Sequence, residues 1–225
     1  MILLSAASLF VLKGKKGYSA HGSTSGPATT GGKSRRENLN MIRDMSYWYS
    51  NEFNSMPYLA DYLTIVGFRE SNFVPTARNP EIETNPRNAA RGLFGMRPGG
   101  VFTSDNGLGY LMDHPNTLYN PRWAFVTAVD YIYRGCKAVN REKSGVTDWA
   151  AIRRWWALPI LIHDFDYNKE RSQENLKRLR KSITDCNNTY GTTISPDFIW
   201  QKVANWDRYP GLKVMMHAYG LGVEA

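Results

Sequence analysis

The amino-acid sequence predicts a mainly α-helical domain with a loop-rich segment near its centre, preceded by a flexible N-terminal arm. Apolar residues recur at helical spacing on both sides of that segment, and no alternating run is long enough for a large sheet. Hydrophobic residues make up 42% and aromatic residues 13% of the 225, which is enough for one packed domain. We expect this domain to span residues 37–225, with a C-terminal helical extension from about residue 165.

Residues 1–36 are expected to form the arm. The first twelve, MILLSAASLFVL, are apolar, but the run is too short for an ordinary transmembrane helix and lacks the preceding Lys or Arg of a secretory signal. The Gly, Ser and Thr residues that follow cannot bury enough surface to fold alone. The apolar end could contact a membrane or dock on a partner protein, and the simpler alternative is a poorly ordered terminus.

The formal net charge of +8 resides mostly in this arm, which argues against nucleic-acid binding. Six basic residues precede Glu37, the first acidic residue, so the rest of the chain carries a net charge of only +2. A nucleic-acid-binding domain needs its basic residues clustered on the folded part. We therefore expect no nucleic-acid partner.

Two helices are predicted between the arm and the loops, over residues 37–53 and 57–71. The second begins at Pro57, a residue type favoured in the first helical turn. The following residues, 72–117, are rich in Pro, Gly and Asn and predict loops. We expect these loops to form the wall of a cleft.

Four helices are predicted after the loops. The first has Asn120 as its N-cap and Pro121 at its first position, and its apolar residues are so dense that it should be central and buried. Thr147 or Asp148 caps the second, and Ser195 opens the last. The predicted ranges are 120–140, 147–159, 168–186 and 195–206.

Glu70 lies where the second predicted helix ends. Counting back in helical steps gives Val66, Leu63 and Leu59, the apolar stripe that an amphipathic helix turns toward a core. A carboxyl group on that face loses contact with water, which raises its pKa and suits it to act as a general acid. If the helix frays before residue 70, the side chain points into solvent instead.

The cysteines and histidines predict no metal site. Cys136 and Cys186 could form a disulfide or be two small buried side chains, and no Cys-x-x-Cys spacing is present. The four histidines are scattered, and the string HDFD, residues 163–166, has no second cluster to complete a ligand set. We expect neither a metal ion nor another cofactor.

Three motifs follow one another between Glu70 and Arg134: ESNFVPTA, RGLFGM and LYNPRWAFVTAVDYIYR. They resemble, in this order, the Glu-Ser-x-Phe-x-Pro-x-Ala, Gly-Leu-Met/Phe-Gln-Met/Leu and Leu-Phe-x-Pro motifs of the lysozyme-like lytic transglycosylases, the family related to goose-type lysozyme. Further along, RRWWALP is a weaker match to the family's Ala-Tyr-Asn-Ala-Gly-Pro. The resemblance implies a lysozyme-like helical fold with a cleft, and cleavage of peptidoglycan glycan strands.

The resemblance also implies roles for individual residues. Glu70 would protonate the glycosidic oxygen between N-acetylmuramic acid and N-acetylglucosamine and then act as a base, while the substrate's acetamido group replaces a second carboxylate. The muramyl O6 would attack to give a 1,6-anhydro product. Ser71 would hydrogen-bond near the acid or the sugar, and a turn that brings backbone groups to the sugar would be formed by Gly92, Leu93 and Phe94.

The chain departs from the family pattern near the acid. Gly95 stands where the family has a glutamine that helps to position the glycan, and if this only weakens positioning, Gly95→Gln should leave the fold intact. The span from Glu70 to Gly92 is longer than in the family, and the surplus is the acidic string PEIETNPR, which could add a substrate-facing loop. The weak match RRWWALP lacks the usual Tyr and Asn, so Tyr131 or Tyr133 could orient the carboxyl instead.

Other side chains are candidates for the cleft. Two or three aromatic residues are expected to stack on sugar faces, and the rest to lie in the core; the candidates are Tyr110, Tyr119, Trp123, Trp155 and Trp156. A second carboxylate roughly 6.5–9.5 Å from the acid would instead indicate an inverting, water-using lysozyme. Its candidates, otherwise solvated loop charges, are Glu81, Glu83, Asp105 and Asp113.

These features predict a peptidoglycan-cleaving enzyme that acts outside the cytoplasm, in the periplasm or cell wall. The arm suits a protein built into a larger assembly, such as a phage virion or a secretion apparatus. The alternative is a structural or glycan-binding protein that keeps the fold without the activity, and the missing glutamine favours it.

Overall fold

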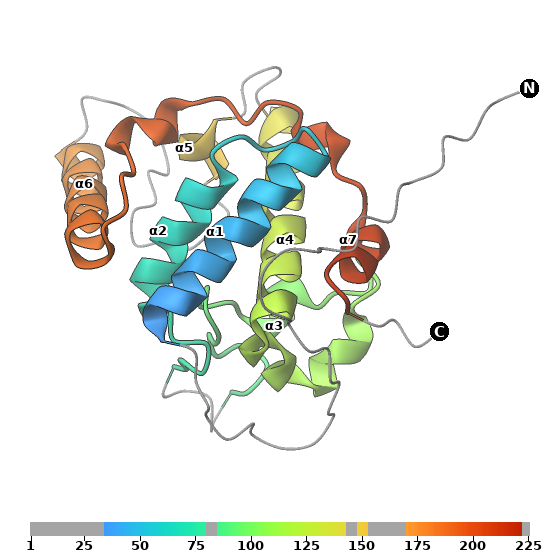
Figure 1. The fold of residues 1–225 in the computed structure, drawn as a ribbon. Helices are drawn as coiled ribbons and strands as arrows, with labels where there is room; N and C mark the ends of the chain where they lie inside the picture. The colour runs from blue at the N-terminus through green and yellow to red at the C-terminus, as the bar shows by residue number, and fades with distance from the viewer. Residues whose placement is uncertain (1–33, 80–84, 143–147, 153–169, 222–225) are drawn as a thin grey trace, which may run out of the picture. The chain divides into compact units, whose positions relative to one another are not determined.

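The computed structural model describes residues 34–79, 85–142, 148–152 and 170–221 (Figure 1). This part of the chain is mainly α-helical, as predicted, and its β-pairing is limited to isolated bridges. None of its helices has the length and hydropathy needed to cross a membrane. The α-helices are α1 (Arg35–Glu52), α2 (Leu59–Ser71), α3 (Pro98–Val101), α4 (Pro121–Glu142), α5 (Trp149–Ile152), α6 (Glu170–Tyr190) and α7 (Leu212–Ala218), and 3₁₀ helices lie at Gly109–Asp113, Pro115–Tyr119, Pro196–Trp200 and Trp206–Arg208.

Helix α1 begins at Arg35, two residues before the predicted start of the domain. Ser34 is the N-cap: its Oγ accepts a hydrogen bond from the Glu37 amide at 3.2 Å, and the Glu37 carboxylate accepts one from the Ser34 amide at 2.6 Å. This reciprocal capping box satisfies amides that the helix itself leaves without acceptors. The helix therefore starts where a cap is available, and residues 1–33 of the predicted arm lie outside the described residues.

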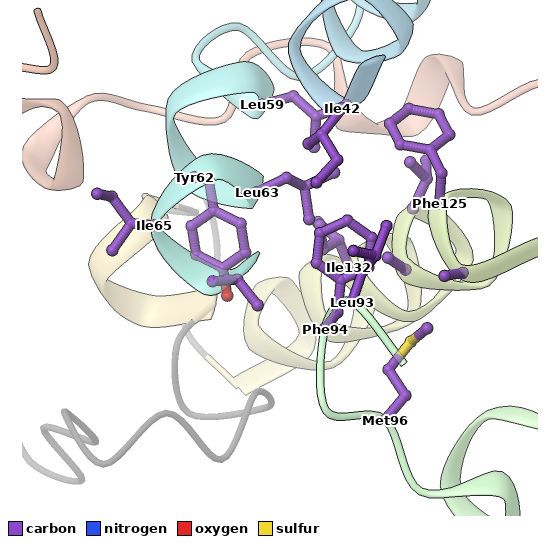
Figure 2. Packing of buried hydrophobic residues seen from close by; sticks show 14 of the residues in the cluster. Ile42, Leu59, Tyr62, Leu63, Ile65, Leu93, Phe94, Met96, Phe125 and Ile132 are labelled. Atoms are coloured by element: carbon purple, nitrogen blue, oxygen red, sulfur yellow. The ribbon is translucent and has the colours of Figure 1, made fainter. Parts of the chain in front are cut away.

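Helices α1 and α2 lie side by side, and α4 passes next to them (Figure 1). Leu59 and Leu63, from the predicted stripe on α2, are fully buried. They pack in one hydrophobic cluster with Ile42 of α1 and Phe125 of α4 (Figure 2). Burying side chains of this size contributes about 1.5–3 kcal/mol each, so this cluster helps to hold α2 in the core.

Helix α4 is the central buried helix that its sequence predicts. Asn120 caps its first turn, because its Oδ1 accepts hydrogen bonds from the amides of Arg122 and Trp123 at 2.9 and 3.5 Å. Pro121 is the first helical residue, where a missing amide hydrogen has no consequence. Residues 124–130 are all buried, as the dense apolar sequence predicts.

The next two predicted helices are present with shifted boundaries. Helix α5 begins at Trp149, and the Asp148 carboxylate caps it by accepting a hydrogen bond from the Ala151 amide. The rest of that predicted helix lies outside the described residues. Helix α6 runs beyond its predicted range of 168–186 and ends before Gly191, whose φ of +67° is the left-handed conformation that often terminates helices.

The helix predicted over residues 195–206 is wrong, and two short 3₁₀ helices take its place. Backbone groups between them bond to distant segments. The Gln201 carbonyl accepts a hydrogen bond from the Trp149 amide at 3.3 Å, and the Ala204 carbonyl accepts one from the Met56 amide at 3.1 Å. A continuous helix would need the Gln201 carbonyl for its own hydrogen-bond ladder, and the tertiary hydrogen bond uses that carbonyl instead.

Cys136 and Cys186 are free and buried, so they form no disulfide with each other. Burial raises the pKa of both thiols above the usual value, which keeps them protonated at neutral pH. The sequence leaves open a disulfide or two separate buried thiols, and the structure shows the buried thiols.

Candidate active site

Glu70 lies in the last turn of α2, beyond the buried apolar stripe of that helix. The helix continues through Ser71, so Glu70 is held on regular helical backbone rather than released by fraying. Its side chain is half-buried, and this burial raises the pKa of Glu70 to about 7 against the lowering effect of the neighbouring Arg69. The sequence-based expectation of a raised pKa is confirmed.

A carboxyl group with a pKa near 7 carries a proton at neutral pH for a large part of the time, whereas a solvated glutamate, with a pKa of about 4.3, does not. Within the described residues, burial and Arg69 are the causes of the Glu70 shift, and no hydrogen bond contributes to it. Among the described residues, no acceptor for this proton contributes to the shift. A group in this state can donate its proton to a substrate oxygen that comes within hydrogen-bond distance.

A tight hairpin from Arg91 to Met96 lies against this carboxyl. The amide of each of these two residues donates to the carbonyl of the other at 3.0 Å, and the Gly95 amide donates to the Gly92 carbonyl at 3.2 Å. Gly92 and Gly95 have φ values of +77° and +58°, a conformation that glycine adopts readily and other residues rarely do. The motif RGLFGM is thus a turn that needs glycine at both of these positions.

Gly95 of this hairpin lies against the acid. A Cβ atom placed on it would overlap the Glu70 Oε2 and lie 3.1 Å from the Glu70 Cβ. A side chain at this position would therefore displace the carboxyl group as well as strain the backbone. Gly95→Gln leaves the fold intact only if the position tolerates a side chain, and the positive φ and this close approach favour a loss of stability instead.

Ser71 joins the end of α2 to the hairpin. Its hydroxyl can donate a hydrogen bond to the Leu93 carbonyl, at 2.8 Å, or to the Gly67 carbonyl, at 3.1 Å. Leu93 and Phe94 are fully buried and point into the hydrophobic cluster, so their side chains support the hairpin from the core side (Figure 2). In the described structure the hydroxyl of Ser71 thus holds the turn in place beside Glu70.

Arg91 is a residue whose importance the sequence reasoning missed. Its side chain is buried, although its hydrogen-bond partners among the described residues are all neutral: the carbonyls of Ala89 and Pro86 and the Asn116 Oδ1. Burial lowers the pKa of Arg91 below its usual value. Its backbone also bridges to Arg78 and Met96, so this one residue ties three segments of the loop region together. An arginine within an otherwise small and apolar string, AARGLF, was the available signal.

A second buried carboxylate, Asp130 on α4, was also missed. Asp130 is 4% exposed, and it accepts hydrogen bonds at 3.0 Å from the Asn106 amide group, the Arg134 Nε and the Tyr209 hydroxyl. Asn106 in turn accepts from two loop amides, at 3.1 and 3.2 Å. This cluster fastens the loop region and the C-terminal segment to the central helix.

The tyrosines predicted to orient the acid make other contacts. The ring of Tyr133 stacks on that of Tyr209, with centroids 4.3 Å apart, and so packs against the C-terminal segment. The Arg134 guanidinium lies over the ring of Tyr131 at 5.3 Å from its centroid, and burial raises the Tyr131 pKa. An orienting or sugar-binding role for Tyr131 stays a prediction.

The remaining candidates are partly placed. Tyr110 is 55% exposed on a 3₁₀ helix, so its ring is accessible to a ligand. Asp105 is exposed, and the exposed Asp113 pairs with Arg87 at 3.1 Å, so both are solvated loop charges. Tyr119 and Trp123 are half-buried, and Trp123 packs against the hydrophobic cluster. The remaining predicted site residues lie outside the described residues; they are Glu81, Glu83, Trp155 and Trp156.

Among the residues that the structure describes, no three His, Cys, Asp or Glu side chains gather into a group able to hold a metal ion. The chain was compared with protein-family models, with curated proteins and with solved structures, and it matches none of them. The geometry around Glu70 and the three sequence motifs are therefore the features that point to a function.

Proposed function

We propose that this chain is a lysozyme-like lytic transglycosylase that cleaves the β-1,4 bond between N-acetylmuramic acid and N-acetylglucosamine in peptidoglycan. The observation that carries the proposal is the half-buried Glu70 carboxyl group, whose pKa is about 7, packed against the glycine hairpin. The resemblance of the three motifs supports the substrate class. Gly95 has no side chain, so no side-chain atom of this residue lies against the Glu70 carboxyl group.

In the proposed reaction Glu70 acts twice. The protonated carboxyl group donates its proton to the glycosidic oxygen as the bond from that oxygen to the muramyl C1 breaks. The substrate's acetamido group stabilises the positive charge that develops at C1, in the role of a second carboxylate. The muramyl O6 then bonds to C1 and returns its proton to the Glu70 carboxylate, so the 1,6-anhydro product forms without water and the acid is regenerated.

The proposal includes a place of action. The enzyme would act in the periplasm or cell wall, carried by a phage virion or an envelope assembly that must open the wall locally. Residues 1–36 would attach it to proteins of that assembly or to a membrane, which their apolar start and basic linker support. Tyr110, which is exposed in the loop region, and the pair Trp155 and Trp156 are proposed to contact the glycan.

The test is incubation of the purified full chain with peptidoglycan sacculi, followed by mass spectrometry of the released muropeptides. Wild-type protein should release fragments that end in 1,6-anhydro-muramyl residues. Glu70→Gln keeps the shape of the side chain but cannot transfer a proton, so its rate should fall on the order of 10²–10⁴-fold. Glu52→Gln, an identical change at the exposed end of α1, is the matched control and should cleave as wild type does.

Each other outcome has a definite meaning. Reducing ends in place of anhydro ends would make the protein a hydrolytic lysozyme and would require a second carboxylate. Equal activity of Glu70→Gln and wild type would remove Glu70 as the acid. Binding to sacculi without cleavage by any variant would favour the inactive, glycan-binding alternative.

A further inference from the structure

We propose that helix α6 positions the candidate acid, through Tyr190 and Ser182, by holding the end of α2 on both sides of Glu70. This inference rests on the proposed function for its catalytic consequence. The resemblance to the transglycosylases ends before α6, so the three motifs assign no role to this helix. Figure 1 shows α6 beside α2, and the two helices are in direct contact.

The first contact lies after the acid. The Tyr190 hydroxyl donates a hydrogen bond to the Asn72 Oδ1 at 2.6 Å, and the Tyr190 ring meets those of Phe68 and Phe73 edge to face, with centroids 6.2 and 5.1 Å apart. Tyr190 is 8% exposed, so this contact is shielded from solvent. The Tyr190 carbonyl is itself held by the Arg36 guanidinium at 3.0 Å.

The second contact lies before the acid. Arg69 Nη1 donates a hydrogen bond to the Ser182 Oγ at 2.7 Å, and the same hydroxyl donates to the Arg178 carbonyl at 2.8 Å. Ser182 is buried. Arg69 is also the charged neighbour that affects the Glu70 carboxyl. The hydrogen bond to Ser182 therefore holds the Arg69 guanidinium, and with it the positive charge, in place.

The backbone between these contacts explains why the end of α2 needs outside support. Asn72 and Phe73 have φ values of +48° and +61°, the left-handed region that residues with side chains enter at a cost in free energy. Such a conformation persists only where surrounding contacts hold it. Here Tyr190 holds the Asn72 side chain, and the Asn38 side chain donates to the Phe73 carbonyl at 3.0 Å.

The contacts with α6 therefore affect the position of Glu70. Glu70 lies two residues before this strained turn, and its carboxyl lies against Gly95. A shift of about 1 Å in a catalytic group can lower a rate by about 100-fold. Tyr190 and Ser182 touch neither the substrate nor the reacting atoms, so they are positioning residues.

The experiment removes one hydroxyl at a time. Tyr190→Phe deletes the bond to Asn72 and keeps the ring, and Ser182→Ala deletes the tether to Arg69. Tyr219→Phe is the matched control, because its hydroxyl donates to the Met45 carbonyl at 3.0 Å, away from α2. Amide hydrogen exchange is followed by NMR in the full chain, and turnover and KM are measured on soluble peptidoglycan strands.

In Tyr190→Phe, the amides that close the end of α2, those of Asn72 and Phe73, should exchange about tenfold faster, with other helices unchanged. Turnover should fall about tenfold at unchanged KM. Ser182→Ala should lower turnover less, and Tyr219→Phe should change neither the exchange of these two amides nor the turnover.

The two proposals fail separately. Exchange at Asn72 and Phe73 that is the same in Tyr190→Phe as in Tyr219→Phe would overturn the positioning role of α6. Faster exchange with unchanged turnover would overturn its catalytic consequence. Faster exchange in a chain whose wild type cleaves no glycan would leave the support of α2 by α6 standing and would overturn the proposed function alone.

Discussion

Among the described residues, the buried carboxyl group of Asp130 and the half-buried one of Glu70 differ in what surrounds them. Asp130 on α4 accepts hydrogen bonds from the Asn106 amide group, the Arg134 guanidinium and the Tyr209 hydroxyl, each at 3.0 Å. Glu70 on α2 is packed against the backbone of Gly95 instead, and no described hydrogen bond contributes to its raised pKa of about 7. Burial with partners and burial without them lead to different chemistry.

Partners stabilise the charged form of a buried carboxyl group, because they replace the hydrogen bonds that water would donate. Asp130 can therefore act as a permanent anchor between segments that are distant in the sequence. Without partners, burial favours the protonated form, and the group becomes an acid that releases its proton near neutral pH. The same functional group thus serves structure at one site and, we propose, catalysis at the other.

The largest change in stability is expected from Asp130→Asn. This substitution removes the charge that the Arg134 guanidinium pairs with and places an amide group against hydrogen-bond donors, so the free energy of unfolding should fall by about 2–4 kcal/mol. Urea unfolding at pH 7 measures it. Turnover per folded molecule should stay near that of wild type, and a selective loss of turnover would show that Asp130 belongs to the catalytic site.

The pH dependence of the reaction should follow Glu70. Since the proposed reaction begins with protonated Glu70 and its pKa is about 7, the turnover rate should decrease about 50-fold between pH 7 and pH 9. Initial rates on sacculi measure this, with circular dichroism as the check that the protein stays folded. A decrease centred near pH 4–5 would mean that Glu70 titrates as a solvated glutamate does.

Gly95→Ala tests the close contact between Gly95 and the Glu70 carboxyl group. The added methyl group strains a backbone with φ of +58° and overlaps the carboxyl group, so stability should fall by about 1–2 kcal/mol and turnover should fall with it. Gly107→Ala is the matched control, because Gly107 has φ of +75° and no atom within 4 Å of the added Cβ. Equal losses in both variants would show that only backbone strain matters at Gly95.

The smallest expected effect is a gain in the free energy of unfolding, from Glu70→Gln. The folded state holds the Glu70 proton more tightly than the unfolded state does, so this group's contribution to stability decreases as the pH rises from about 4.3 to about 7 and stays low above that. Glu70→Gln removes the buried charge and should raise the free energy of unfolding by about 1–2 kcal/mol at pH 8, a value reduced for partial exposure, and by nothing at pH 4. A loss of stability at pH 8 would show that the carboxylate has a stabilising partner.

Local sequence signals predicted much of the helical structure. Asn120 with Pro121 marked the start of α4, and the spacing from Leu59 to Val66 marked the inward face of α2. Such signals succeed where neighbouring residues decide the conformation. They failed over residues 195–206, because carbonyl groups there bond to segments far away in the chain, which no local pattern records.

The candidate site shows the same division. By itself the sequence determined that Glu70 lies on the buried face of a helix end and that glycines follow in RGLFGM, because helical periodicity and glycine content are local properties. Only the tertiary structure decided that Gly95 lies against the Glu70 carboxyl, and that Asp130 accepts three hydrogen bonds. It also decided that α6 contacts the end of α2 through the hydrogen bond from Tyr190 to Asn72. Burial and hydrogen-bond partners arise from contacts between distant segments, and they, rather than residue type, decide whether a carboxyl group holds its charge or its proton.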